Sequence, residues 1–177
     1  MVVAGRVAAP LAALLVAAVA ASGAAAAHRA PAASLSPLET SVLADINAFR
    51  AGHGLARLRL SRQLSGAARA HSVQMAADGY FAHESADGSA FWQRVQTFYS
   101  SSPWRFWSVG ENLLWSSPDA TPARALKMWL ASPEHRANLM NPRWREIGVA
   151  AVHEAAAPGA FQSLDVTIVT TDFGVRR

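Results

Sequence analysis

The chain has 177 residues and no cysteine, which excludes disulfide bonds, thiol catalysis and zinc sites built on thiolates. Its 16 Lys and Arg residues exceed its 12 Asp and Glu residues, so the formal net charge is +4. The basic residues are scattered, which argues against a specific nucleic-acid-binding protein and allows a weak attraction to anionic envelope polymers or lipid headgroups.

The first 27 residues are typical of a secretory signal peptide. Arg6 supplies a short positive region, an apolar run follows it, and four successive alanines fit a cleavage site after Ala27. An uncleaved membrane anchor is the rival interpretation, because small and apolar residues continue almost to Ala27. The mostly alanine composition of the run favours cleavage, and we therefore predict a secreted protein or one associated with the cell envelope.

The remaining chain is long enough for one domain. Removal of residues 1–27 leaves about 150 residues, which can bury a substantial core. Residues 28–36 are a short linker of Ala, Pro and Ser, and the domain is expected over residues 37–177. No later segment is long and apolar enough to cross a bilayer, and we expect a monomer.

Helices are expected first along this domain. Ser36 to Glu39 combine a capping box with a proline at the first helical position, and Gly79 lies where a helix terminator is expected. The helical periodicity and such start and stop signals together predict five helices: over residues 37–52, 61–78 and 90–98, from Thr121 to the residue before Ser132, and from Ser132 to Asn141.

Three segments are typical of strands that bury at least one face. They comprise residues 109–115, 147–152 and 164–173, and the last is rich in β-branched side chains. Helices with apolar stripes must cover the apolar faces of such strands, so the pattern predicts a layered α+β domain.

Two histidines and a glutamate lie beside residues that punctuate the backbone. His83 follows Phe81-Ala82, Glu111 stands between Gly110 and Asn112, and His135 follows Ser132-Pro133-Glu134. Imidazole and carboxylate groups together can bind a divalent cation or relay a proton. The three segments are far apart in sequence, so only the fold can bring these side chains together.

These segments belong to an ordered series of short motifs that resembles the CAP superfamily. That superfamily contains cysteine-rich secretory proteins, antigen 5 and plant pathogenesis-related proteins, and the resemblance is nearest to its bacterial SCP-like branch. It covers roughly residues 38–174. The series is N-x-x-R (Asn47, Arg50), F-x-H (Phe81, His83), D-G (Asp87, Gly88), G-E-N (Gly110 to Asn112), W-L-x-S-P-x-H-R (Trp129 to Arg136) and D-F-G (Asp172 to Gly174).

The resemblance implies an α-β-α three-layer sandwich with a central, mostly antiparallel sheet. It also implies a binding cleft in which His83, Glu111 and His135 meet, bordered by Asn112 and Ser132. Eukaryotic members carry a second glutamate where this chain has Ser132, so the fourth member of the set is missing or replaced. Asn112 is expected to tie two chain segments together rather than to perform chemistry.

The surroundings of Glu111 and His135 leave specific alternatives open. A carboxylate followed by apolar residues is costly unless it is paired, and Arg50, Arg94 or a backbone amide could pair with Glu111. That pairing could be structural, functional or both. His135 lies in the first turn of its helix, where the helix dipole lowers the pKa of a histidine and favours the neutral, metal-binding form.

Two functions from different classes follow. The first is a secreted binding module whose cleft holds a small ligand, a lipid or an envelope polymer, with His83 and His135 as ligands of a divalent cation such as zinc. The alternative is a metal-assisted hydrolase of peptide, nucleic acid or peptidoglycan, in which Glu111 is the general base. The missing second glutamate favours the binding module over an enzyme.

Overall fold

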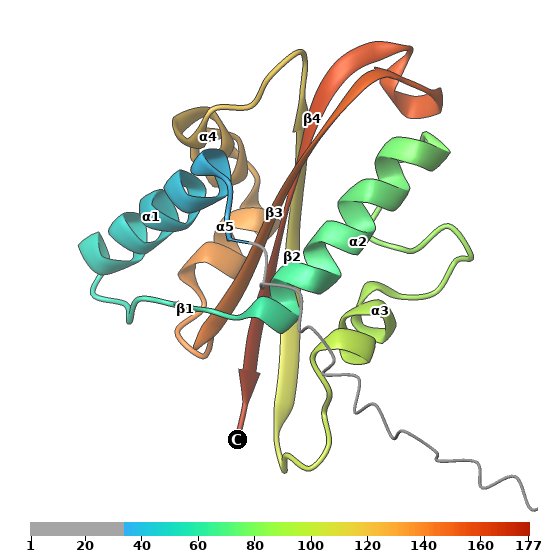
Figure 1. Cartoon of the computed structure of the whole chain (residues 1–177). Helices are drawn as coiled ribbons and strands as arrows, with labels where there is room; N and C mark the ends of the chain where they lie inside the picture. Colours follow the sequence, from blue (N-terminus) through green and yellow to red (C-terminus); the bar gives the residue numbers. More distant parts are fainter. Residues whose placement is uncertain (1–33) are drawn as a thin grey trace, which may run out of the picture. The chain divides into compact units, whose positions relative to one another are not determined.

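The computed structural model describes residues 34–177, which form one compact unit. The predicted signal peptide and all but the last residues of the predicted linker lie outside this range. Within it, no helix has the length and apolar character needed to cross a membrane. The elements in chain order are α1 (Pro37–Gly52), β1 (Arg59–Leu60), α2 (Arg62–Asp78), α3 (Phe91–Phe98), β2 (Trp107–Ser116), α4 (Pro122–Ala131), α5 (Pro133–Met140), β3 (Glu146–Ala157), the 3-10 turn η1 (Gly159–Phe161) and β4 (Leu164–Arg176) (Figure 1).

The five helices begin and end close to where local sequence signals predict. The backbone N–H of Glu39 donates to Ser36 Oγ at 3.2 Å, and Glu39 Oε2 accepts from the Ser36 N–H at 2.7 Å, which confirms the capping box of α1. Gly79 caps α2 with a left-handed φ of 70°. A Cβ at Gly79 would lie 2.9 Å from the Pro158 carbonyl, so glycine also permits a close approach of two chain segments.

The strands are longer than the apolar pattern predicts. β3 and β4 pair antiparallel from Glu146 opposite Gly174 to Ala157 opposite Leu164, so β3 continues from its predicted end at residue 152 to Ala157, while β4 continues from residue 173 to Arg176. Backbone hydrogen bonds extend a strand pair wherever the two chains stay adjacent, whether or not the side chains are buried. The sheet order is β1-β3-β4-β2, and every pairing is antiparallel except that of the short β1 with β3.

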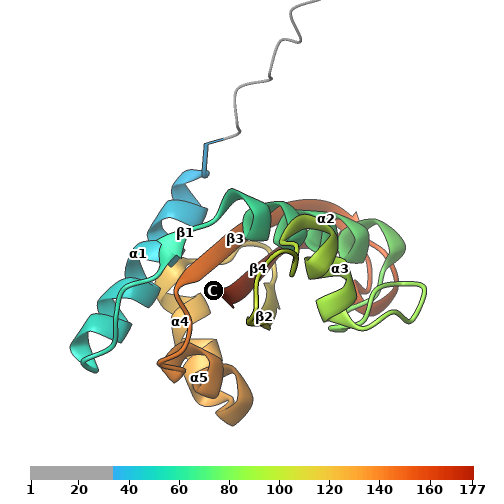
Figure 2. The same cartoon turned by 90° about the horizontal axis from the view of Figure 1, so that it is seen from below.

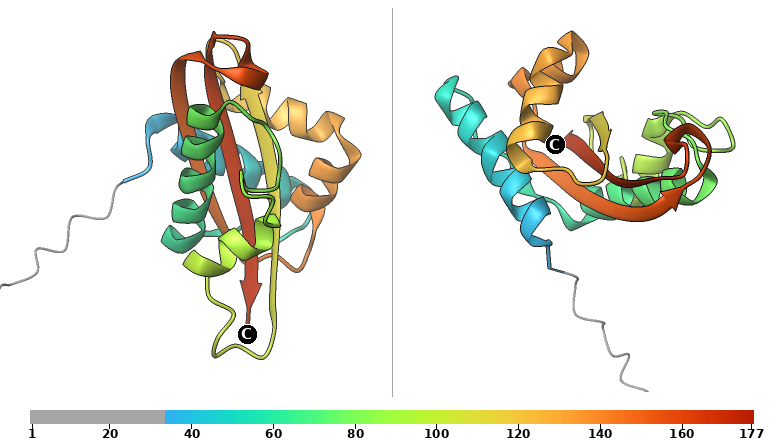
Figure 3. Two further views of the ribbon diagram at one scale, coloured as in Figure 1. Left: turned by 90° about the vertical axis from the view of Figure 1, so that its right-hand side faces the viewer. Right: turned by 90° about the horizontal axis from the view of Figure 1, so that it is seen from above.

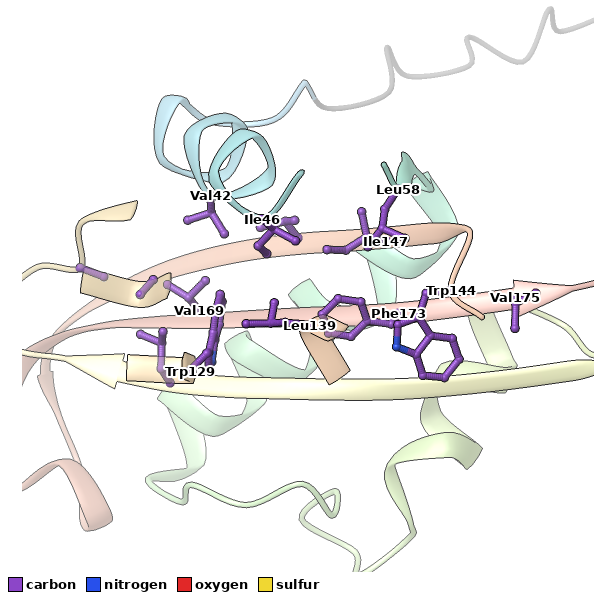
Figure 4. Packing of buried hydrophobic residues seen from close by; sticks show 14 residues of the cluster. Val42, Ile46, Leu58, Trp129, Leu139, Trp144, Ile147, Val169, Phe173 and Val175 are labelled. Carbon is purple, nitrogen blue, oxygen red and sulfur yellow. The ribbon is translucent and has the colours of Figure 1, made fainter. Parts of the chain in front are cut away.

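Helices cover both faces of this sheet, as the predicted α-β-α sandwich requires. Viewed along the strands, α1, α4 and α5 lie on one side and α2 and α3 on the other (Figure 2; Figure 3, right). The larger core fills the space between the sheet and the first group, and Trp129, Ile147 and Phe173 are among its fully buried members (Figure 4). Smaller clusters join α2 and α3 to the opposite face.

The contact between α2 and β3 is unusually close at Gly148. A Cβ on Gly148 would lie 2.1 Å from the backbone carbon of Leu64 and 2.2 Å from the backbone nitrogen of Ser65. Only hydrogen fits between strand and helix at this point. The Ser65 hydroxyl also accepts a hydrogen bond from the Val149 N–H at 3.2 Å, which fixes the helix along the strand.

Candidate functional site

Strand β2 lies at one edge of the sheet, and its successive side chains point to opposite faces. Asn112 points to the side of α5, where its Nδ2 donates to the His135 carbonyl at 3.0 Å. Asn138 on α5 donates from Nδ2 to Asn112 Oδ1 at 2.8 Å and to the Glu111 carbonyl at 3.0 Å. A Cβ on Gly110 would lie 2.9 Å from Asn138 Oδ1. Gly110 and Asn112 therefore dock α5 on β2, and Asn112 has the tying position that the sequence predicts.

Glu111 points to the other face and is almost fully buried, with 1% of its side chain exposed. Its Oε1 lies 2.8 Å from His83 Nδ1, and its Oε2 accepts a hydrogen bond of 2.6 Å from Arg94 Nη2. Of the three partners left open by the sequence, Arg94 on α3 is the observed one. Arg50 instead donates to the carbonyl groups of Ala56, Leu139 and Asn141, where it joins α1 to the end of α5.

His83 lies in the loop between α2 and α3, and 45% of its side chain is exposed. Arg94 holds this loop through hydrogen bonds from Nη1 to the His83 carbonyl at 3.2 Å and to Ser85 Oγ at 3.0 Å. The hydrogen bond to the Glu111 carboxylate raises the pKa of His83, and this effect exceeds the opposing effect of partial burial. Glu111 thus orients the imidazole and makes it more basic.

His135 approaches the same place from the opposite layer. Its backbone N–H lies 3.5 Å from the hydroxyl of Ser132, the N-cap of α5. The His83 and His135 rings have centroids 6.3 Å apart and planes inclined by 54°. Burial, and next the neighbouring charge of His83, lower the pKa of His135. The direction agrees with the sequence prediction, but the largest cause is loss of solvation rather than the helix dipole.

Ser132, the position at which the family resemblance implies a second acidic residue, has a capping role here. Ser132 Oγ donates to Glu134 Oε2 at 3.1 Å, and Glu134 is exposed. Glu134 therefore points to solvent and does not replace a missing acidic member of the site. The structure joins His83, Glu111 and His135, while Ser132 and Asn112 position the chain around them.

One acidic residue beneath this site was not assigned a role from the sequence. Asp172 on β4 is directly opposite Glu111 in the strand register and is fully buried. Within residues 34–177, neither carboxyl oxygen of Asp172 has a hydrogen-bond partner. Burial, followed by the negative charge of Glu111, raises the pKa of Asp172 well above its ordinary value, which favours a neutral carboxyl group. The sequence did contain a signal for this position, because Asp172 is an acidic residue that directly follows a run of apolar and β-branched residues.

Among the side chains that meet at this site, His83 and His135 are the two that could bind a cation. No group of three or more His, Asp or Glu side chains in residues 34–177 is arranged to hold a metal ion. His83 Nδ1 faces Glu111, so Nε2 is the nitrogen left for a ligand, in the carboxylate–histidine arrangement that commonly supports metal-bound imidazoles. The lowered pKa of His135 favours the neutral, metal-binding form of that residue, whereas the pKa of His83 is raised. Water or a bound ligand would have to complete the coordination.

Comparisons with known proteins agree with this architecture. A model of the cysteine-rich secretory protein family, CAP, matches residues 43–170. The protein YkwD of Bacillus subtilis (strain 168) is 32% identical over 123 residues, which are 70% of this chain and 46% of YkwD. The membrane protein YlbC of the same organism is 32% identical over 111 residues, covering 63% of this chain and 30% of YlbC. The chain thus spans less than half the length of these curated relatives.

Solved structures share the fold. An outer surface protein of Borrelia burgdorferi superposes with a TM-score of 0.62 at 20% identity, covering 78% of this chain and 92% of that protein. An extracellular protein of Bacillus anthracis str. Ames that contains an SCP domain gives a TM-score of 0.60 at 25% identity, covering 82% of this chain and 45% of that one. The α-β-α arrangement is therefore common to surface and extracellular proteins of other bacteria.

Proposed function

The chain belongs to the CAP family of cysteine-rich secretory proteins, and we propose that it acts outside the cell or at the cell envelope as a binding module. The location is supported by the signal-like first 27 residues and by the outer surface and extracellular proteins that share the fold. The binding site is the pair His83 and His135, which holds a divalent cation and, through that cation, an oxygen-bearing ligand.

The contact between His83 Nδ1 and Glu111 Oε1, at 2.8 Å, is the observation that carries this proposal. It directs the remaining nitrogen of a half-exposed imidazole away from the buried carboxylate. Arg94 in turn fixes the second oxygen of Glu111. A histidine oriented in this way loses less side-chain entropy when it binds a ligand, because its rotamer is already restricted.

The same contacts argue against Glu111 as the general base of a hydrolase. Both of its oxygens are engaged, one by His83 and one by Arg94, and its side chain is 1% exposed. A general base must reach the proton of the attacking water directly or through one bridging water. Glu111 would first have to give up a buried ion pair, so its geometry suits the support of His83 better than proton abstraction.

Calorimetric titration with zinc tests the cation site. We expect binding by the wild type at micromolar metal, with the affinity reduced at least about tenfold in His83→Ala and in His135→Ala, because each removes one ligand. His153→Ala is the matched control, since His153 is an exposed histidine on β3 whose side-chain contacts are with Asp119 and Thr167. Absence of heat for the wild type, or an equal loss in the control, would remove the cation from the proposal.

A pH titration tests the pairing with Glu111. The folded pKa of His83 is raised, so the pair stabilises the folded state below the unfolded pKa of histidine, and this contribution is lost as the pH rises through the folded pKa. Protonated His83 cannot bind a cation, and zinc affinity should fall as the pH is lowered through that pKa. Glu111→Gln should lower the pKa of His83, as measured by NMR of the imidazole protons. An unchanged His83 titration in this variant would contradict the role of Glu111.

A further inference from the structure

Three chain segments meet at the end of the sheet that contains the last residues of β4 and enclose a pocket of about 550 Å³. Phe106 and Arg177 exchange two backbone hydrogen bonds of 2.9 and 3.0 Å, which bring the start of β2 to the end of β4. The Arg145 N–H donates to the Gly174 carbonyl at 3.0 Å, so the turn before β3 lies alongside. This end is the lower one in Figure 1, close to the label of the C-terminus. The pocket is lined by Phe106, Pro142, Arg143, Arg145, Val175, Arg176 and Arg177.

Four of the seven lining residues are arginines, and among residues 34–177 no Asp or Glu side chain lines the pocket. The guanidinium of Arg176 is already engaged, because its Cζ lies 4.0 Å from the Tyr99 ring centroid and its Nε lies 3.9 Å from Glu146 Oε2. Arg143, Arg145 and Arg177 differ from Arg176 in having no such carboxylate contact within the described residues. Within residues 34–177, none of the three is a member of an ion pair.

Two of these three arginines are held in place by the fold. Arg145 Nη1 donates to the carbonyls of Pro142 at 2.7 Å and Trp144 at 2.8 Å, and these hydrogen bonds hold the guanidinium group against the turn before β3. The Arg177 guanidinium lies 5.0 Å from the centroid of the Phe106 ring. Such anchoring lowers the entropic cost of binding an anion, because the donors are already restricted before the ligand arrives. Arg143, Arg145 and Arg177 line one pocket and form no ion pair within residues 34–177, so an anion bound there would be attracted by all three.

We propose that this pocket binds a phosphate ester, with Arg143, Arg145 and Arg177 around the phosphate oxygens. Guanidinium groups match phosphate and carboxylate oxygens with forked hydrogen bonds, and one arginine is enough to pair both oxygens of a planar carboxylate. Three arginines from two different segments suit the tetrahedral phosphate, which presents more oxygens in more directions. Phe106, Pro142 and Val175 form an apolar wall for the organic part of the ester. The volume lies within the usual range for small-molecule sites.

The soluble phosphate ester and the headgroup of an anionic lipid share this chemistry, and two probes distinguish them. The first is glycerol 3-phosphate, titrated into the full chain and followed by NMR, with glycerol as the uncharged counterpart. The second is co-sedimentation with vesicles of phosphatidylglycerol, compared with vesicles of phosphatidylcholine. Each is measured for the wild type, Arg143→Glu and Arg177→Glu. Thermal unfolding of every variant verifies that the fold is kept.

Arg124→Glu is the charge-matched control, because Arg124 is an exposed residue of α4, whose helix lies towards the opposite end of the sheet in Figure 1. We expect Arg143→Glu and Arg177→Glu each to weaken binding by about tenfold, and Arg124→Glu by less than about twofold, because a distant surface charge is screened. This pattern with glycerol 3-phosphate supports the site with a soluble ester as ligand, and the same pattern with vesicles alone supports it with a lipid headgroup.

Two results would overturn the proposal. The first is an equal loss in Arg124→Glu and Arg143→Glu, which would reveal attraction by net charge instead of a site. The second is no binding of either probe by the wild type. Neither result bears on the zinc titration of His83 and His135, so the proposed phosphate site and the proposed cation site are tested independently.

Discussion

Arg94→Met is expected to lower the free energy of unfolding by about 3 kcal/mol, because it leaves the Glu111 carboxylate buried without its cationic partner. The side chains of Arg94 and Glu111 are 8% and 1% exposed, and the contact between them is 2.6 Å. Urea unfolding at neutral pH measures the loss. The variant should also free the loop at His83, since Arg94 holds the His83 carbonyl and Ser85.

Two further variants distinguish the stability lost by leaving Glu111 unpaired from the effect of removing any positive charge. The double variant Arg94→Met/Glu111→Gln should recover much of the lost stability, because a neutral amide is cheaper to bury than an unpaired carboxylate. Arg69→Met is the matched surface control. Arg69 faces Glu39 at 3.7 Å with 63% of its side chain exposed, and its removal should cost less than about 1 kcal/mol. If Arg94→Met lost no more stability than Arg69→Met, the claim that the buried pair of Arg94 and Glu111 stabilises the fold would be refuted.

Gly148→Ala is expected to destabilise the protein by about 3 kcal/mol or more, because the new methyl group overlaps the backbone of α2. The Cβ would lie 2.1 Å from the Leu64 carbon and 2.5 Å from its oxygen, and a backbone cannot move aside as a flexible side chain can. Either α2 shifts away from β3 or the strand bends. Because α2 leads into the loop with His83, zinc affinity should fall as well.

The control for this substitution is Gly52→Ala, at the last residue of α1. Apart from its chain neighbours and the nearby backbone of α1, no atom of residues 34–177 lies within 4 Å of a Cβ built on Gly52, and its φ is not positive. Alanine should therefore leave stability unchanged or raise it by roughly 0.5–1 kcal/mol, through a less flexible unfolded chain and a better helix propensity. Thermal unfolding of both variants provides the comparison. Equal effects at Gly148 and Gly52 would contradict the close packing of α2 on β3.

The helices could be predicted closely because their ends depend on neighbouring residues. Ser36 and Glu39 satisfy the first N–H groups of α1 by themselves, and Gly79 alone supplies the left-handed residue that ends α2. Strand ends depend instead on a distant partner. β4 continues to Arg176 because β2 and β3 flank it, and β1, with only Arg59 and Leu60, carries no periodic signal at all.

The residues of the candidate site could be predicted from the sequence, but the contacts that each of them makes could not. His83, Glu111 and His135 were expected to meet, and they do, yet the partner of Glu111 was left open among three. Asp172 was assigned no role because only the pairing of β2 with β4 places it opposite Glu111. The arginine pocket was not foreseen either. Its members belong to segments that only backbone pairing brings together.

The sequence by itself determined the layered α+β class, the helix boundaries and the three residues that meet at the histidine site. The class and the helix boundaries follow from local rules of capping and periodicity, and the meeting of the three residues follows from the resemblance to the CAP superfamily that the ordered motifs carry. Only the tertiary structure decided which charges are paired and which are left free. A charge is compensated or exposed according to what faces it across a layer or a strand pair, and sequence separation does not constrain that distance. Glu111 is therefore a buried anchor for His83, while Arg143, Arg145 and Arg177 form no ion pair within residues 34–177 and can face an anion.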